Sequence, residues 1–362
     1  MEQKRLGDIA TYINGYAFKP EDRGSTGLPI IRIQDLTGNA YDLGFYDGKY
    51  PEKIEINDGD VLISWSASLD VYIWNRGKGL LNQHIFKVVF DKCEVNKQYF
   101  VFAVKYKLKE MELKTHGATM KHIVKKDFDN TVIPFPTVEK QADIAYILSK
   151  IESIVEFRQQ ELQQLDDLIK ARFVEMFGDM YLNSKGWPEA KLESMADVVS
   201  GITKGRKTKA EDLTEVPYMA VSNVKDGYID WTTVKTIEAT QQEIEQYRLL
   251  ADDVLMTEGG DPDKVGRGAI IKEPLENCIH QNHIFRVRLD ESMILPEFFA
   301  EYLQHQRSKR YFLGCAKQTT GIASINMTQL RALPVLMPPL PKQEEFVLFK
   351  AQVNKSKLKK LR

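Results

Sequence analysis

The chain has 362 residues, of which 43% are hydrophobic and 28% are charged, and its formal net charge is −1. This length predicts two or three domains, because a typical domain has about 150 residues, and the composition is that of a globular protein. A net charge near zero excludes a global attraction to nucleic acid or to an anionic membrane. Binding to either would need local patches of charge.

Composition also bears on location and on redox chemistry. No apolar run approaches the roughly 18 residues that span a bilayer, and the polar start MEQKRLGDIA lacks the apolar segment of a signal peptide. We therefore expect a cytoplasmic protein. The three cysteines, Cys93, Cys278 and Cys315, have no CxxC spacing. They are expected to act as small hydrophobic side chains in a reducing compartment, without disulfide bonds.

An internal repeat becomes visible when the chain is aligned with itself. Three segments of the first half, each typical of a strand, recur in the second half in the same order. Residues 28–33 (LPIIRI) match 216–221 (VPYMAV), 60–64 (DVLIS) match 253–257 (DVLMT), and 82–88 (NQHIFKV) match 281–287 (QNHIFRV). The third pair keeps an amide pair, a histidine, two apolar residues, a cation and a valine in order, so chance is a poor explanation.

The fourth repeated feature is a proline-rich strand end followed by Lys-Gln. Residues 132–136 (VIPFP) with Lys140-Gln141 match 336–341 (LMPPLP) with Lys342-Gln343. Proline stops a strand and is accepted in the first turn of a helix, so a helix is predicted to begin after each proline element.

The first of these helices is predicted to be long. Its apolar residues alternate at spacings of four and three, which is typical of a coiled-coil seam, and it extends from about Glu139 to Phe177 with Gly178 as its stop. At roughly 58 Å it is too long to be covered by one ordinary domain, so a partner helix or subunit must bury its seam. An amphipathic core helix is the alternative. The second helix is shorter and ends at Arg362. The predicted coiled-coil and partner-binding residues are Ile144, Leu148, Ile151, Val155, Leu162, Leu165, Ile169, Phe346 and Val353.

These duplicated junctions and the NQHIF and QNHIF segments resemble the specificity subunit of type I restriction-modification systems over essentially the entire chain. The resemblance implies two target-recognition domains, each followed by a helix, and an antiparallel packing of the two helices. It implies double-stranded DNA, two methyltransferase (modification) subunits and a motor-nuclease (restriction) subunit as partners. Self-association through the helices is an alternative that follows from the short second helix, which a second chain would complete. Catalysis would belong to those partners, which would bind S-adenosylmethionine, and ATP with Mg for cleavage; no cofactor is expected in this chain.

The repeat and the resemblance together predict a mixed α/β fold (α+β). Two pseudo-repeated globular domains with twisted sheets would be joined by long helices in an antiparallel coiled coil. The predicted parts are a first target-recognition domain at 1–137, a central helix at 138–178, a second target-recognition domain at 179–340 and a short C-terminal helix at 341–362.

Basic segments occupy equivalent places in the two copies, at 113–126 and 302–343, and neither contains Asp or Glu. Cations of this kind contact phosphates, while Arg and Asn side chains such as Asn223 can contact bases. The loops at 64–79, 203–209 and 259–268 differ between the copies, so different sequences should be recognised. For each single residue a structural role is an equally weighted alternative. The predicted DNA-binding residues are Arg76, Lys78, Lys121, Lys125, Lys126, Lys204, Arg206, Lys207, Lys209, Lys264, Arg267 and Lys317.

Several catalytic or metal sites are disfavoured. Cys278, His280 and His283 lie close in sequence, but no CxxC or HExxH completes a zinc ligand set. His84 and His283 have no nucleophile motif nearby, so packed or backbone-bonded side chains are expected. The Gly-rich segment 259–266 lacks GxxxxGK[ST], and the chain has neither GxGxxG nor an Asn-Pro-Pro-aromatic segment. No catalytic residue and no metal site are predicted.

The leading hypothesis is thus a non-catalytic DNA sequence-specificity subunit, with one half of a bipartite target recognised by each domain. A duplicated protein-interaction module on a coiled-coil scaffold is the alternative, and DNA binding distinguishes the two. An enzyme acting on DNA by itself would need methyl-donor or metal-site residues that the sequence does not display.

Overall fold

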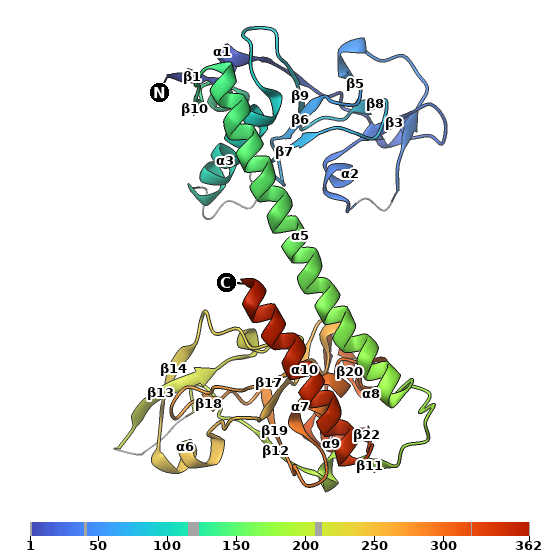
Figure 1. Ribbon diagram of the computed structural model, residues 1–362, viewed down its shortest axis with the longest axis vertical. Helices are drawn as coiled ribbons and strands as arrows, with labels where there is room; N and C mark the ends of the chain where they lie inside the picture. The colour runs from blue at the N-terminus through green and yellow to red at the C-terminus, as the bar shows by residue number, and fades with distance from the viewer. Residues whose placement is uncertain (1, 40–41, 115–122, 207–211, 320, 362) are drawn as a thin grey trace. The chain divides into compact units, whose positions relative to one another are not determined.

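The computed structural model describes residues 2–39, 42–114, 123–206, 212–319 and 321–361. The chain forms two compact units, unit 1 (Met1–Phe157) and unit 2 (Arg158–Arg362), whose boundary lies inside the long helix α5 (Val138–Phe177). Figure 1 shows sheets and helices in each unit, which is the predicted mixed α/β fold. Within the described residues, no helix is both long and apolar enough to cross a membrane.

Unit 1 is built on a four-stranded antiparallel sheet with the strand order β2-β9-β6-β7. Its strands are β2 (Thr11–Asn14), β9 (Ile85–Val89), β6 (Val61–Ser64) and β7 (Asp70–Ile73). The main core of the unit lies between this sheet and three helices, α1 (Leu6–Ile9), α3 (Lys97–Lys114) and α4 (Lys125–Asp129). All four residues of β6 are buried, which explains why its sequence is apolar without alternation.

A second, mixed sheet of unit 1 covers a smaller core around Trp74. Its order is β4-β3-β8-β5, in which β3 and β8 run parallel, and α2 (Ile33–Thr37) follows β3. The strands are β4 (Phe45–Tyr46), β3 (Leu28–Ile31), β8 (Gly79–Leu81) and β5 (Glu55–Ile56), and a separate pair joins β1 (Gln3–Arg5) to β10 (Val132–Pro134).

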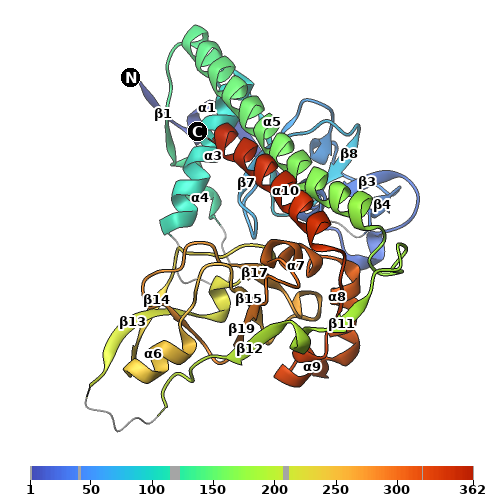
Figure 2. The ribbon, with the colours of Figure 1, turned by 60° about the horizontal axis from the view of Figure 1, so that its bottom comes forward.

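Unit 2 repeats this plan. Its antiparallel sheet has the order β12-β19-β15-β17, its mixed sheet β14-β13-β18, and its separate pair β11-β22. The strands are β12 (Ala196–Ser200), β19 (Ile284–Leu289), β15 (Val254–Thr257), β17 (Gly268–Ile270), β14 (Lys235–Ala239), β13 (Thr214–Met219), β18 (Ile279–His280), β11 (Glu189–Lys191) and β22 (Pro334–Leu336). The helices are α6 (Gln241–Tyr247), α7 (Pro296–Tyr302), α8 (Gln306–Cys315), α9 (Met327–Arg331) and α10 (Leu340–Leu361). Figure 2 shows α6 beside β13 and β14, and apolar residues of all three share a core.

The strand register proves that the two units are copies. In unit 1, Val61 of β6 lies opposite Val88 of β9, and in unit 2 Val254 of β15 lies opposite Val287 of β19. These are the same pairs that the sequence alignment made equivalent. A shift of one residue would move every side chain to the other face, so the shared register confirms the predicted repeat.

Unit 2 contains one further sheet, with the order β16-β21-β20, formed by β16 (Gly259–Gly260), β21 (Ile322–Ser324) and β20 (Lys317–Thr319). Short 3-10 helices complete both units at Pro20–Asp22, Glu52–Ile54, Leu192–Ser194, Val221–Asn223 and Pro262–Lys264.

Helix α5 runs without a break because its sequence contains neither proline nor glycine. It ends where predicted, at Gly178, whose φ of +80° is left-handed and whose N–H donates to the carbonyl of Val174 at 2.7 Å. Beside its C-terminal part lies α10 (Figure 1). Three ion pairs join the two helices within unit 2, Arg172 to Glu345, Asp166 to Lys357 and Glu161 to Lys360. Residue numbers fall along α5 as they rise along α10, so the predicted antiparallel packing is confirmed for this part.

The predicted seam residues do not share one environment. Ile169, Phe346 and Val353 are buried, whereas Leu162, Leu165, Ile144 and Leu148 are half-buried. Ile151 and Val155 are exposed by 51% and 49%. The described residues thus bury the seam toward the C-terminal end of α5, and its role in binding a partner stays a prediction.

The repeated Lys-Gln step has a structural role. Gln141 and Gln343 are fully buried near the starts of α5 and α10. The Gln141 amide accepts from the backbone N–H of Asn96 at 2.9 Å and donates to the carbonyl of Pro136 at 2.8 Å. Gln343 repeats both bonds with Leu295 and Pro338 at the same distances. Each glutamine therefore ties a helix start to the proline element and to the segment before another helix, where buried polar backbone needs a partner.

Candidate nucleic-acid interface

Four of the predicted DNA-binding cations are held by carboxylates. The Lys78 Nζ lies 2.9 Å from Glu55 and the Lys125 Nζ lies 2.6 Å from Asp129. Lys264 pairs with Asp261, three residues before it. Arg206 makes a bidentate pair with Glu243 of α6 and also donates to the carbonyl of Glu238. These neighbours neutralise much of the charge that a phosphate would meet.

Three other predicted cations, Lys126, Lys204 and Lys317, are exposed and have no carboxylate partner within the described part of the chain. The Arg76 guanidinium lies 4.5 Å from the centre of the Trp74 ring and donates to the carbonyl of Asp35.

The remaining predicted DNA-binding residues are Arg267 and three lysines. Arg267 is half-buried, and its Nε has no hydrogen-bond partner among the described residues. Lys121, Lys207 and Lys209 lie outside the described residues. The whole set stays a prediction, of which Lys126, Lys204 and Lys317 offer the most available charge.

Asn223 does not contact bases in this fold. Its side chain is fully buried, its Oδ1 accepts from the N–H of Ala220 at 2.9 Å and its Nδ2 donates to the carbonyl of Asp230 at 2.9 Å. The interpretation of Asn223 as an adenine contact is therefore wrong, because both ends of the amide already hold the turn after β13.

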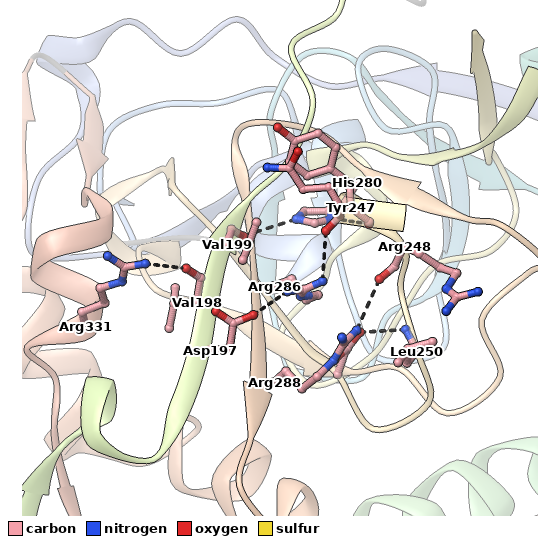
Figure 3. Close-up of polar contacts among 12 residues, drawn as sticks. Asp197, Val198, Val199, Tyr247, Arg248, Leu250, His280, Arg286, Arg288 and Arg331 are labelled. Carbon is pink, nitrogen blue, oxygen red and sulfur yellow. Dashed lines mark hydrogen bonds and ion pairs between the residues drawn. The ribbon is translucent and has the colours of Figure 1, made fainter. Parts of the chain in front are cut away.

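The cation that recurs in the repeat, Lys87 in β9 and Arg286 in β19, is also structural. Lys87 lies 2.9 Å from the carboxylate of Asp60. Arg286 is 5% exposed and pairs with Asp197 at 2.6 Å (Figure 3). Buried charges persist only when they are paired, so the cation at this repeated position has a structural role in each sheet.

Figure 3 also shows the hydrogen bonds of Arg288, Arg331 and His280 in unit 2. Arg288 makes two 2.8 Å contacts with Asp253 and donates to the carbonyl of Arg248, and Arg331 donates to the carbonyl of Val198. The ring of His280 lies between the carbonyls of Tyr247 and Val199, at 3.0 and 3.3 Å. Both nitrogens of His280 thus face backbone, so the ring is not available as a metal ligand.

We expect acid to destabilise unit 2 through His280. Burial lowers the pKa of His280 to about 4, whereas an unfolded histidine titrates near 6.5. Below pH 6.5 this histidine is protonated in the unfolded chain but stays neutral in the folded chain. The free energy of unfolding therefore decreases as the pH is lowered, by about 2 kcal/mol between pH 7 and pH 5. Denaturant unfolding of the His280→Asn variant at both pH values should show a smaller decrease in the free energy of unfolding. Part of the decrease that remains comes from His305, because burial lowers its pKa as well. An undiminished drop would contradict this assignment.

The two units share a backbone arrangement directly after β6 and β15. The N–H of Trp65 donates to the carbonyl of His84 at 3.2 Å, and Trp65 accepts from the N–H of Ile123 at 2.9 Å. In unit 2 Glu258 makes the same two bonds, with His283 at 2.9 Å and Ile325 at 2.8 Å. Trp65 and Glu258 therefore occupy one position of the repeated fold.

A cavity of about 320 Å³ opens at this position in each unit. In unit 1 it is lined by Asn14, Trp65, Phe86, Ile123, Val124 and Lys125, and in unit 2 by Val221, Glu258, Gly259, His283 and Ser324. The strand register in unit 2 brings a predicted cation to this place, because Gly259 and Lys317 both lie opposite Ser324 of the central strand β21. Each unit thus presents a hollow with different chemistry on the same framework.

The two repeated histidines differ in their contacts. The His84 ring packs against Trp65 at 4.8 Å between centres, as expected of a packed histidine. The side chain of His283 is 55% exposed, and its Nδ1 lies 2.5 Å from Oε2 of Glu258, so the expectation of a packed or backbone-bonded ring is wrong there. Sequence reasoning missed Trp65 and Glu258 as an equivalent pair, although each directly follows an aligned strand.

Comparison with known proteins defines the class of the chain. Residues 1–167 and 184–360 match the family described as "Type I restriction modification DNA specificity domain". The chain is 22% identical to the "Type I restriction enzyme EcoBI specificity subunit" of Escherichia coli over 370 residues, which cover 94% of this chain and 77% of that protein. It is 24% identical to the EcoKI specificity subunit of Escherichia coli (strain K12) over 375 residues, which cover 94% and 79%.

A solved structure supports the same fold. The "Type-I restriction-modification system S subunit from M. genitalium" superimposes with a TM-score of 0.54 at 14% identity, covering 99% of this chain and 90% of that one. Two family regions in tandem, on two copies of one fold, define a DNA specificity protein with two recognition domains. The chain belongs to the type I restriction modification DNA specificity family and is a specificity subunit. The predicted family, fold class and function are confirmed.

Proposed function

We propose that unit 1 and unit 2 each contact one half of a bipartite double-stranded DNA target, and that the face of each unit around its equivalent cavity is turned to the DNA. The observation that carries the proposal is the conserved backbone frame with a changed side chain, Trp65 in one unit and Glu258 in the other. A shared frame keeps the docking geometry, while different side chains contact different base edges.

The partners form the second part of the proposal. Two methyltransferase subunits bind the helical region, and a motor-nuclease subunit joins for cleavage. The exposed apolar residues Ile151 and Val155 of α5 support a helical contact surface, because apolar side chains in line on a helix are stabilised when a partner covers them. S-adenosylmethionine, and ATP with Mg, are placed on those partners. We also place the chain in the cytoplasm, where it would meet cellular DNA.

Methylation mapping tests the proposed function directly. The genome of a cell that carries this gene and its methyltransferase partner should contain a split methylated motif, and the motif should disappear when the gene is deleted. An unchanged methylome after deletion would refute it. The scaffold alternative predicts no DNA binding by the complex.

We expect the double variant Lys204→Ala/Lys317→Ala to weaken binding to all DNA sequences about equally. Both side chains are exposed without a carboxylate partner among the described residues, so each would release counterions from phosphate. The slope of log K against log salt should fall in magnitude by about 2, at roughly 0.9 per contact. Fluorescence anisotropy of labelled duplexes over a salt series measures it.

The matched control is Lys170→Ala/Lys191→Ala, which also removes two exposed lysines. Lys170 lies 3.8 Å from Asp167 and Lys191 lies 3.5 Å from Glu193, so their charge is already offset. Equal salt slopes for both double variants would contradict the placement of Lys204 and Lys317 at phosphates.

A further inference from the structure

The pair formed by Glu258 and His283 is arranged as a hydrogen-bond acceptor site. A carboxylate can only accept, so the 2.5 Å contact between His283 Nδ1 and Glu258 Oε2 places a proton on Nδ1. The amide Nδ2 of Asn282 lies 3.5 Å from His283 Nε2, on the other side of the ring. His283 thereby fixes the direction of the carboxylate. No hydrogen bond of the described residues uses Glu258 Oε1.

The backbone holds this carboxylate in place. The N–H of Glu258 bonds to His283 and its carbonyl to Ile325, and the next residue, Gly259, begins β16. A Cβ at Gly259 would lie 2.9 Å from the carbonyl oxygen of Ala323, so a larger residue would push the strand apart. The Glu258 side chain is 34% exposed at the cavity that Val221, Gly259 and Ser324 help to line. The acceptor is therefore preorganised and open to a ligand.

The charges around the cavity suit a nucleic acid. Lys317 is exposed and lies in register with Ser324, which lines the cavity. This cation would attract a phosphate to the side of the cavity. A carboxylate beside this cation would repel DNA unless a base donated a hydrogen bond to it, and in the major groove the exocyclic amine of cytosine is the donor that Glu contacts.

We propose that Glu258, oriented by His283, accepts a hydrogen bond from the N4 amine of a cytosine in the half-site contacted by unit 2. The equivalent position in unit 1 holds Trp65, beside Phe86, with its Nε1 donating to Asn14 at 3.2 Å. None of the residues that line the unit 1 cavity is a carboxylate, so the two units differ chemically at this equivalent position. The inference rests on the proposed DNA-reading function and names a base contact within it.

The test selects binding sites for the full chain in complex with its methyltransferase partner, using duplexes with two randomised tracts. In the Glu258→Gln variant, which keeps the shape of the side chain, the preference for cytosine at one position of one half-site should fall by about 5- to 150-fold, the range of one lost base contact. The other half-site should be unchanged. The Trp65→Phe variant should alter only the opposite half-site.

The control is Glu276→Gln, the same chemical change at an exposed carboxylate of unit 2, which should leave both half-sites unchanged. If Glu258→Gln keeps the parental motif, or if it weakens binding to all sequences alike, Glu258 is no base contact and the inference fails while the proposed function stands. If the unaltered complex enriches no motif at all, the proposed function fails, and the inference with it.

Discussion

Replacement of Phe173 by alanine should lower the free energy of unfolding of unit 2 by about 3–5 kcal/mol. The Phe173 side chain of α5 is fully buried and contacts four rings, those of Phe177, Phe298, His305 and Phe346, with centres 4.3–5.5 Å away. Truncation removes aromatic contacts and leaves a cavity where α5, α7 and α10 meet. Urea unfolding followed by circular dichroism measures the change.

An exposed apolar residue of the same helix pair provides the control. Leu348 of α10 is 66% exposed, so Leu348→Ala should change the free energy of unfolding by no more than about 0.5 kcal/mol. Similar losses for Phe173→Ala and Leu348→Ala would show that the packing of α5 on α10 does not stabilise unit 2.

The Glu243→Gln substitution should lower the free energy of unfolding by about 2 kcal/mol at neutral pH. Glu243 pairs with Arg206, and the two side chains are only 23% and 20% exposed. Chiefly through the hydrogen bonds of Arg206, the pKa of Glu243 is lowered to about 2. The single amide oxygen of glutamine can still accept from the N–H of Thr240 at the start of α6, so the variant keeps that capping bond and removes the charge and one of the two hydrogen bonds from Arg206.

The pH dependence of that loss follows from the sign of the pKa shift. Because the folded pKa of Glu243 lies below the ordinary value near 4.5, its stabilisation is complete above pH 4.5 and disappears as the pH falls toward 2. The gap in unfolding free energy between wild type and variant should therefore be full at pH 6 and smaller at pH 3.5. Glu238→Gln, at an exposed residue of the neighbouring strand, is the control. A gap that stays constant with pH would contradict the ion pair.

The repeated framework was predictable because it depends on local chemistry. Strands such as 60–64 and 253–257 are apolar without alternation, since both faces are buried. The ends of helix α5 were predicted to within one residue, because its apolar period, the proline before its start and the glycine after its end are all local features of the sequence. The buried amides Gln141 and Gln343 were visible only as a motif, and their bonds to backbone far away in sequence were not.

The sequence could not predict which of the candidate cations are paired with carboxylates. A run of lysines and arginines has the same appearance whether its charge is free or paired. Arg206 meets Glu243 from 37 residues away, while Lys204, two residues before it, has no carboxylate partner in the described chain. Asn223 is of a residue type that can contact bases, but its side chain is buried and stabilises the turn after β13.

The sequence by itself determined that this protein contains two copies of one fold with a long helix between them, because periodicity, turns and the start and stop signals of a helix depend on residues that are neighbours along the chain. Only the tertiary structure decided which polar residues remain available to DNA. Hydrogen bonds and ion pairs act over about 3 Å in space whatever the separation in sequence. The contact between Glu258 and His283, 25 residues apart, therefore became visible only once the strands had brought them together.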